Sequence, residues 1–272
     1  MKIFKATPTN GHIWLPKKDV SQRALNRIKR LAAFSNPQFY KTQKMRMSTY
    51  GIPRIIYSLD ETIEYMGIPR GCRLSLVHLL EDCNVNYEFE DKRNTGKKIN
   101  VNFKGTLHDE QQSAVDTLLQ HENGVLSVPT AFGKTVIGVS LIAQKRCNTL
   151  ILVHLHTLLD QWKKLLEQFL EINESLPETV SKRGRKKALS LIGQIGSGKN
   201  TASGIIDIAL VQSLIRDNEA DDIVKNYGMV IVDECHHVPS VNYEKILGAV
   251  NAQYVYGLPQ ENMSVKVSII RV

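Results

Sequence analysis

The hydrophobic pattern of this 272-residue chain changes near Thr106. Before that point short apolar stretches are separated by turn residues, and after it apolar runs of four to six residues alternate with amphipathic segments. Strands that are apolar along their whole length are typical of a parallel sheet covered by helices on both faces. The sequence therefore predicts an α/β domain with a doubly wound, mostly parallel sheet over residues 106–258. A basic α+β region over 1–105 precedes it, and an off-pattern tail over 259–272 follows.

The first region contains short predicted elements. Helical spacing of apolar residues predicts helices over residues 21–34, 60–66 and 73–84. Pro, Asn and Gly predict turns at "SNPQFY" (35–40) and at both copies of "GIPR" (51–54 and 67–70). Alternation predicts strands within 86–103, on either side of a turn at 94–96.

The second region alternates regularly between the two kinds of element. Helices are predicted over 107–120, 134–145, 156–170 and 221–227. Strands are predicted over 124–128, 148–154, 188–193, 205–213 and 228–234. On the third helix, the apolar stripe favours core packing over base stacking for Trp162, and Gln161 is the better candidate for nucleic-acid contact.

Composition excludes several classes of protein. Hydrophobic residues make up 42% and charged residues 23%, which is unlike collagen or a wholly disordered chain. No apolar run reaches the roughly 18 residues that span a bilayer, and the N-terminus lacks the apolar segment of a signal peptide. We therefore expect no membrane partner and a cytoplasmic location. The four cysteines form no CxxC pair, which predicts free thiols.

Positive charge is concentrated near the N-terminus. The net charge is +8, and residues 1–50 hold eleven Lys or Arg against one acid, Asp19. The rest of the chain is close to neutral, with 24 basic and 26 acidic residues. A basic block on a neutral body favours contact with a polyanion such as nucleic acid, and the alternative is a solvated surface. The same alternatives apply to the basic loop "SKRGRKK" at 181–187.

Two segments compete as the loop that would bind a nucleoside triphosphate. "VPTAFGKT" (128–135) ends in Gly-Lys-Thr but has valine where the GxxxxGK[ST] pattern has its first glycine. "GQIGSGKN" (193–200) has both glycines but ends in asparagine instead of a hydroxyl residue. The first lies between a predicted strand and a predicted helix, so loop amides and the helix N-terminus converge on one point. It is the predicted phosphate loop, and the second is predicted to be a hairpin turn with a solvent-facing Lys199.

The predicted nucleotide-binding residues follow from that choice. They are Val128, Pro129, Thr130, Ala131, Phe132, Gly133, Lys134 and Thr135. Lys134 is expected to bind the outer phosphates, and the Thr135 hydroxyl to bind Mg²⁺.

Two adjacent acids follow an apolar strand in "VIVDECHH". Asp233 and Glu234 would lie at the carboxyl edge of the sheet, where ligands bind in open α/β folds. ATP hydrolysis needs one carboxylate to hold Mg²⁺, partly through water, and one to activate the attacking water. We assign these roles to Asp233 and Glu234. A zinc site at Cys235, His236 and His237 is disfavoured, because three consecutive residues converge poorly on one tetrahedral ion.

Together these segments resemble motifs of the superfamily 2 helicases and translocases. "VPTAFGKT" and "DECHH" are similar to motifs I and II of the DExH kind, which includes XPB, UvsW and type III restriction translocases. "LHDEQQSAV" resembles the segment before motif I, "LILVHLHTLLDQW" resembles motif Ia, and "IDIALVQSL" resembles a later segment that touches the nucleic-acid backbone. The N-terminal stretch "LAAFSNPQFYKTQKMRMSTYGIPRII" is similar to that of bacterial helicases of mobile elements and conflict systems.

The resemblance implies a RecA-like ATP-binding lobe that uses ATP and Mg²⁺ and acts on nucleic acid. DNA is favoured over RNA, although the sequence does not decide between the two. It implies that Gln111 reads adenine and that His236 couples the γ-phosphate site to motif III. It also implies that His156, Gln161, Gln212 and Ser213 contact nucleic acid.

The family pattern breaks off after "AQYVYGL". Motif III and the second lobe with its arginine finger do not follow, so we expect a truncated or split form that hydrolyses ATP weakly on its own, with a second lobe on another chain as a possible partner. Two alternatives remain open. One is a nucleotide-binding subunit without turnover, and the other is a DNA-binding fragment without enzymatic activity.

Overall fold

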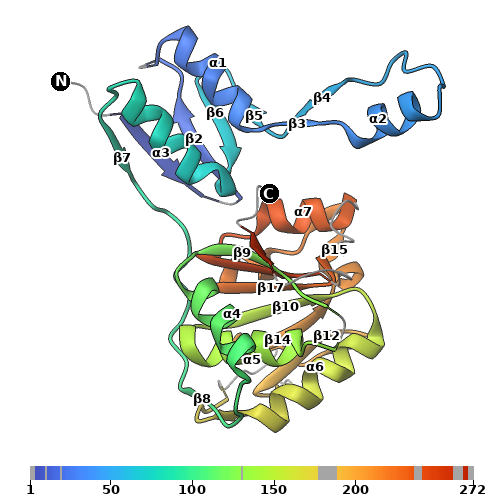
Figure 1. The fold of residues 1–272 in the computed structure, drawn as a ribbon. Coiled ribbons are helices and arrows are strands. Elements are labelled where there is room, and N and C mark those ends of the chain that lie inside the picture. Colours follow the sequence, from blue (N-terminus) through green and yellow to red (C-terminus); the bar gives the residue numbers. More distant parts are fainter. Residues whose placement is uncertain are drawn as a thin grey trace. The chain divides into compact units, whose positions relative to one another are not determined.

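A computed structural model describes residues 4–9, 11–18, 20–129, 131–176, 189–235, 241–259 and 266–268. The chain divides into two compact units, one up to Lys92 and one from Arg93 onward. Residues 93–105 therefore belong with the second unit, although the hydrophobic pattern places them in the first region. Each unit has a sheet and a hydrophobic core of its own (Figure 1).

The second unit contains an eight-stranded sheet in the order β13-β12-β14-β10-β17-β18-β9-β19. The six inner strands are parallel, and the two outer ones pair antiparallel with their neighbours. Their bounds are β9 Asn123–Ser127, β10 Thr149–Val153, β12 Ile192–Gly196, β13 Lys199–Asn200, β14 Ile206–Leu210, β17 Met229–Asp233, β18 Tyr254–Leu258 and β19 Lys266–Ser268. The predicted mostly parallel α/β fold is confirmed, and part of the expected off-pattern tail forms β19.

Helices cover both faces of this sheet. Their bounds are α4 Asp109–Leu119, α5 Lys134–Lys145, α6 His156–Phe169 and α7 Val241–Ala249, with 3-10 turns η2 Val211–Leu214 and η3 Asp222–Asn226. Alternate residues of β10 point to opposite faces, so Ile151 and Val153 pack with α4, α5 and α6, while Leu150 and Leu152 pack with α7, η2 and η3. This two-sided burial explains why the strand is apolar throughout. Two small antiparallel pairs complete the unit. One joins β8 Val101–Phe103 to β11 Leu170–Ile172, and the other is a hairpin of β15 Ile215–Arg216 with β16 Glu219–Ala220.

Two buried polar side chains hold the amino-terminal edge of the parallel strands. The Asn148 amide donates to the carbonyls of Gly204 and Asn226, and its oxygen accepts from the N–H groups of Lys97 and Gly228. Asp207 has no exposed surface, and its carboxylate accepts hydrogen bonds from Ser203 N, Gly204 N and the Tyr227 hydroxyl at 3.0, 2.8 and 2.7 Å. Buried polar groups contribute to stability only when they are paired in this way.

Asp207→Asn is expected to destabilise the second unit by about 3 kcal/mol, because hydrogen bonds to a buried charge are lost and an amide N–H₂ is brought against backbone donors. The measurement is the midpoint of chemical denaturation. Asp222→Asn is the matched control, since Asp222 is exposed and solvent screens its ion pair with Lys225, so this substitution should leave the stability nearly unchanged. Equal destabilisation by the two variants would contradict the assignment.

The core of the first unit combines a five-stranded sheet, in the order β5-β6-β2-β1-β7, with two helices. Its elements are β1 Phe4–Pro8, β2 His12–Pro16, α1 Gln22–Leu31, β5 Asp60–Glu61, β6 Tyr65–Pro69, η1 Arg70–Cys72, α3 Arg73–Asp82 and β7 Tyr87–Phe89. The helices predicted at 21–34 and 73–84 are confirmed over shorter ranges.

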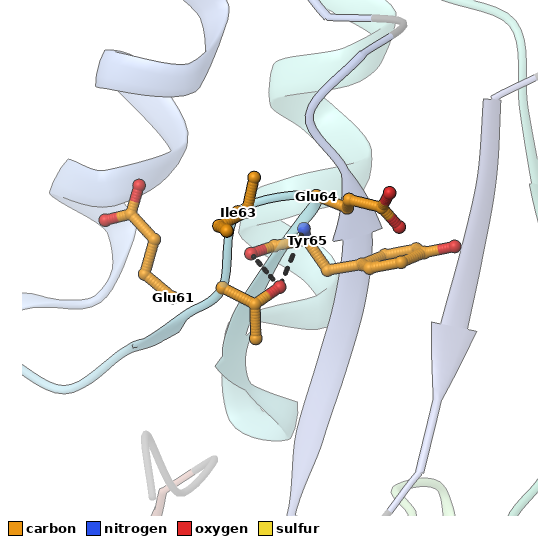
Figure 2. A pocket seen from close by; sticks show the side chains of 5 residues that line it. Glu61, Ile63, Glu64 and Tyr65 are labelled. Carbon is orange, nitrogen blue, oxygen red and sulfur yellow. Dashed lines mark hydrogen bonds between the residues drawn. The ribbon is translucent and has the colours of Figure 1, made fainter.

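The helix predicted over 60–66 is wrong, because these residues form the β5–β6 hairpin. Met66 and Ile68 are buried and β6 pairs with β2, which places Gly67 against the Trp14 ring. The Thr62 hydroxyl bonds to both backbone polar groups of Tyr65 and closes the turn (Figure 2). The turn predicted for the second "GIPR" copy is wrong for the same reason, since its first three residues lie in β6.

An arm leaves the first unit between α1 and β5. It consists of β3 Ala33–Ser35, α2 Pro37–Lys44 and β4 Ile55–Tyr57, and it extends away from the sheet of its own unit (Figure 1). The turn predicted at "SNPQFY" is wrong, because Asn36 caps α2 by accepting from Gln38 N and Pro37 occupies its first turn. The Asn36 amide also donates to Pro53 O at 2.8 Å, which ties the two sides of the arm together.

Candidate nucleotide-binding site

The predicted phosphate loop lies between β9 and α5. Gly133 precedes α5 with φ +86°, and Ala131 has φ +68°, so the loop turns sharply through left-handed conformations that favour small residues. The first-glycine position of the pattern is occupied by Val128, which is buried in the core. Val128 therefore anchors the end of the strand, and the loop that surrounds the α5 N-terminus consists of the residues after it. Thr130 lies outside the described residues.

Gln111 contacts this loop directly. Its side-chain N–H₂ donates to Phe132 O at 2.7 Å, and its oxygen accepts from His108 N at 3.0 Å. A Cβ atom at position 133 would lie 2.6 Å from the Gln111 amide nitrogen, so only glycine permits this approach. The structure thus brings the predicted adenine-reading residue to the phosphate loop.

The two acids lie at the end of β17, close to the same loop. Asp233 is 1% and Glu234 is 7% exposed. Glu234 has φ +51°, and its N–H donates to Leu258 O and to Asp233 Oδ1, both at 3.0 Å. Lys134 Nζ forms an ion pair with Glu234 and lies 3.7 Å from Asp233 Oδ1. Two motifs 99 residues apart in the sequence therefore form one site.

Burial raises the pKa of Asp233. The Trp162 N–H and the Lys134 charge act in the opposite direction and favour the ionised carboxylate. A nearby positive charge strongly stabilises the ionised form of a buried carboxylate, because the cation compensates for the solvation that burial removes.

Trp162 is fully buried on α6, as predicted for a core residue. Its indole N–H also donates to Asp233 Oδ2 at 2.8 Å. Nothing in the spacing of apolar residues indicates this bond, since it joins side chains 71 residues apart.

The predicted nucleic-acid residues lie at the carboxyl edge of β10, β14 and β12. His156 and Gln161 are exposed on the first half of α6, and Gln212 is exposed in η2 beside the half-buried Ser213. Gln212 donates to His154 O at 3.1 Å, and Ser197 bonds to the His156 ring. The structure therefore brings His156 and Gln212 to one edge.

Ser197 belongs to the β12–β13 turn, which contains the second glycine-rich segment. The predicted hairpin is confirmed, with Gly196 opposite Lys199 and both Lys199 and Ser197 exposed. The sequence pattern does not indicate that this turn lies beside His156. Its glycines and its lysine resemble those of a nucleotide-binding loop, and they give no sign that the turn lies near the motif Ia segment.

Three of the sequence predictions concern residues that the structure does not describe or covers only in part. His236, the predicted coupling residue, and the basic loop at 181–187 lie outside the described residues. Within the described residues, no three His, Cys, Asp or Glu side chains gather as a metal site, and the disfavoured zinc site includes His236 and His237 from outside that set.

All four cysteines are free thiols, as predicted. In the described parts of the chain, no helix combines the length and apolar content that crossing a bilayer requires.

Comparison with known proteins agrees with this geometry. Residues 104–259 match the family described as type III restriction enzyme, res subunit. The chain is 29% identical over 210 residues to putative helicase 109L of Invertebrate iridescent virus 3, covering 75% of this chain and 59% of the relative. It is 27% identical over 158 residues to the DNA 3'-5' translocase XPB2 of Sulfurisphaera tokodaii, covering 58% and 31%. The chain thus spans between about a third and three fifths of the length of these relatives.

The fold matches that of a solved structure, the UvsW helicase from bacteriophage T4. The TM-score is 0.62 at 17% identity, and the match covers 95% of this chain and 92% of the other. With the family match over residues 104–259, the helicase relatives and the predicted phosphate loop beside the paired acids, this chain belongs to the type III restriction enzyme, res subunit family and carries the ATP-binding lobe typical of superfamily 2 helicases.

Proposed function

We propose that this chain binds ATP with Mg²⁺ between the phosphate loop and β17, and that it couples ATP hydrolysis to action on nucleic acid. The observation that carries the proposal is the convergence of Lys134 with Asp233 and Glu234 at the N-terminus of α5. A lysine, two acids and inward-facing loop amides are the groups that phosphoryl transfer requires, because its catalysis is mainly positioning and charge stabilisation.

The residues present fit these ligands. Thr135 is buried in the first turn of α5, and its hydroxyl with the Asp233 carboxylate offers the oxygen donors that Mg²⁺ prefers, some of them through water. The α5 N-terminus, with Gly133 directly before it, suits a chain of phosphates. Bound Mg²⁺ would neutralise charge on the transferring phosphoryl group.

Each residue then has a defined task. Lys134 exchanges its ion pair with Glu234 for oxygens of the β and γ phosphates. Glu234, released from the lysine, accepts a proton from the attacking water as general base. Gln111 holds the loop and hydrogen-bonds the adenine edge. An arginine from a second helicase lobe would stabilise charge at the γ-phosphate.

Nucleic acid is the proposed substrate, and DNA is proposed over RNA. Of the relatives, XPB2 is a DNA translocase by name, while L396 of Acanthamoeba polyphaga mimivirus, 25% identical over 208 residues, is named a putative RNA helicase. The edge formed by His156, Gln161, Gln212 and Ser213 supplies hydrogen-bonding groups for a phosphate backbone, beside the exposed Lys199.

The arm of the first unit offers a second contact for nucleic acid. No acid occurs between residues 20 and 59. Four exposed basic residues lie on the arm, namely Lys41, Lys44, Arg46 and Arg54. None of the α2 residues is buried, and Tyr50 and Tyr57 are exposed by 97% and 52%. Positive charge with exposed aromatic rings is suited to phosphates and unstacked bases.

The proposal is tested by nucleotide-dependent stabilisation. MgATP at 100 times its Kd should raise the free energy of unfolding by about 2.7 kcal/mol, measured as a thermal shift. Lys134→Ala should abolish the shift, because the lysine contacts the outer phosphates. Lys199→Ala, the matched control in the second glycine-rich segment, should retain it. The reverse pattern would place the nucleotide at the β12–β13 turn and overturn the proposed site.

A further inference from the structure

Trp162 links the acid strand to the helix that carries the nucleic-acid candidates. It has no exposed surface, and its Nε1–H donates to Asp233 Oδ2 at 2.8 Å. The other oxygen of this carboxylate, Oδ1, accepts from Glu234 N at 3.0 Å. With one donor on each oxygen, the orientation of the carboxylate is fixed.

The same indole ring packs against the helix that follows the phosphate loop. A Cβ atom at Gly138 of α5 would lie 2.6 Å from Trp162 Cη2 and 3.2 Å from Leu258 Cδ1. Only glycine leaves room for the ring between α5 and α6. Trp162 therefore touches α5, whose first turn holds Lys134 and Thr135, and binds the end of β17 through Asp233.

This arrangement couples the position of α6 to the carboxylate. His156 and Gln161 are exposed on the same helix, and Gln161 is the residue directly before Trp162. The interior is close-packed, so a shift of α6 moves the buried ring with it. A moved ring changes the hydrogen bond to Asp233 Oδ2, because that bond depends steeply on distance and angle.

We propose that Trp162 is a positioning residue that orients the Asp233 carboxylate for Mg²⁺ and transmits movement of α6 to it. The inference rests on the proposed function, in which Asp233 is a Mg²⁺ ligand. Trp162 does not touch the substrate and acts through Asp233.

The first test separates hydrogen bonding from packing. ATP affinity is measured for the whole chain with EDTA and with Mg²⁺, and the ratio of the two affinities is the Mg²⁺ effect. Trp162→Phe retains most of the ring volume but loses the N–H, so its Mg²⁺ effect should fall roughly 10- to 100-fold while its affinity in EDTA stays close to wild type. Leu166→Val, on the same buried side of α6, should lower thermal stability and keep the full Mg²⁺ effect.

The outcomes distinguish the two proposals. A wild-type chain that shows no Mg²⁺ effect would contradict the proposed function. A wild-type chain with a clear Mg²⁺ effect that persists in Trp162→Phe would overturn the positioning role alone. An equal loss in Leu166→Val would also overturn it, because general loosening of α6 would then account for the result.

A second measurement does not depend on how well Trp162→Phe folds. The chain has two tryptophans, so Trp14→Phe leaves Trp162 as the only indole fluorophore. Adding Mg²⁺ to the ATP complex should change the Trp162 emission, because the charge on the carboxylate that accepts its N–H becomes neutralised. The change should disappear when Asp233→Asn is added to the same chain. An emission that ignores Mg²⁺ while Mg²⁺ still tightens ATP binding would overturn the inference.

Discussion

Replacing Glu234 with glutamine is expected to slow nucleic-acid-stimulated ATP hydrolysis by roughly 10²- to 10⁴-fold, the usual contribution of a general base. The amide has nearly the same shape as the carboxylate but cannot accept a proton from water. Binding of MgATP should persist, because in the proposed site Lys134 and the loop amides hold the phosphates. Removing the Glu234 charge also frees Lys134 from its ion pair, which favours the phosphate-bound position of the lysine.

The measurement compares steady-state turnover and nucleotide affinity of the two proteins with and without DNA. The predicted quantity is a ratio to the wild-type rate, so a slow wild-type chain does not alter it. Glu219→Gln, at an exposed position, is the control and should match the wild type. If DNA leaves wild-type turnover unchanged while MgATP still binds, the alternative of a nucleotide-binding subunit without turnover is supported. DNA-stimulated turnover that survives in Glu234→Gln would refute the general-base assignment.

Neutralising the arm is expected to produce the largest change in nucleic-acid binding. The variant carries alanine at Lys41, Lys44, Arg46 and Arg54. Each lost phosphate contact reduces the slope of log affinity against log salt by about 0.9 for duplex DNA and about 0.7 for single strands. If all four residues contact phosphates, the slope for duplex DNA should fall by about three to four, with the largest loss of affinity at low salt.

The control variant removes the same charge elsewhere. Lys97, Lys98, Lys104 and Lys164 are exposed in the second unit, and their replacement by alanine leaves the arm intact. A local contact predicts that only the arm variant flattens the salt dependence. A similar effect of both variants would assign the basic arm to a solvated surface that acts through net charge alone. Binding is measured by fluorescence anisotropy over a range of salt concentrations, with duplex and single-stranded DNA.

The second unit could be predicted closely because its signals are local. The helix predicted over 134–145 begins and ends at those residues, since Gly133 marks its start and the apolar period continues to Lys145. Asp233, Glu234 and the phosphate loop could be brought to one sheet edge because parallel strands all end there. The order of strands supports this, with β18 between β17 and β9.

The remaining features depend on distant contacts. Residues 65–69 pair with β2, and this pairing overrides the helical spacing of their apolar positions. The Trp162–Asp233 bond joins residues 71 positions apart, and Asn148 bonds to groups between 51 and 80 positions away. No local signal in the sequence distinguishes Trp162 or Asn148 from other buried tryptophans and asparagines, so their roles are seen only in the folded chain. The link to mobile-element helicases stays a prediction.

The side-chain amide of Asn148 helps to make the amino-terminal edge of the sheet the most rigid part of the second unit. Its four hydrogen bonds and three hydrogen bonds of Asp207 all lie where β10, β14 and β17 begin, at the edge opposite the candidate nucleotide site. Opening that edge would break several buried bonds at once, whereas the phosphate loop and the Lys134 ion pair can rearrange without touching them. In hydrogen exchange, the amides of Lys97 and Gly228 should therefore exchange only through global unfolding, while loop amides near Gly133 exchange through local motion. Local motion in the second unit would then be confined to the carboxyl edge of the sheet, while the amino-terminal edge stays rigid.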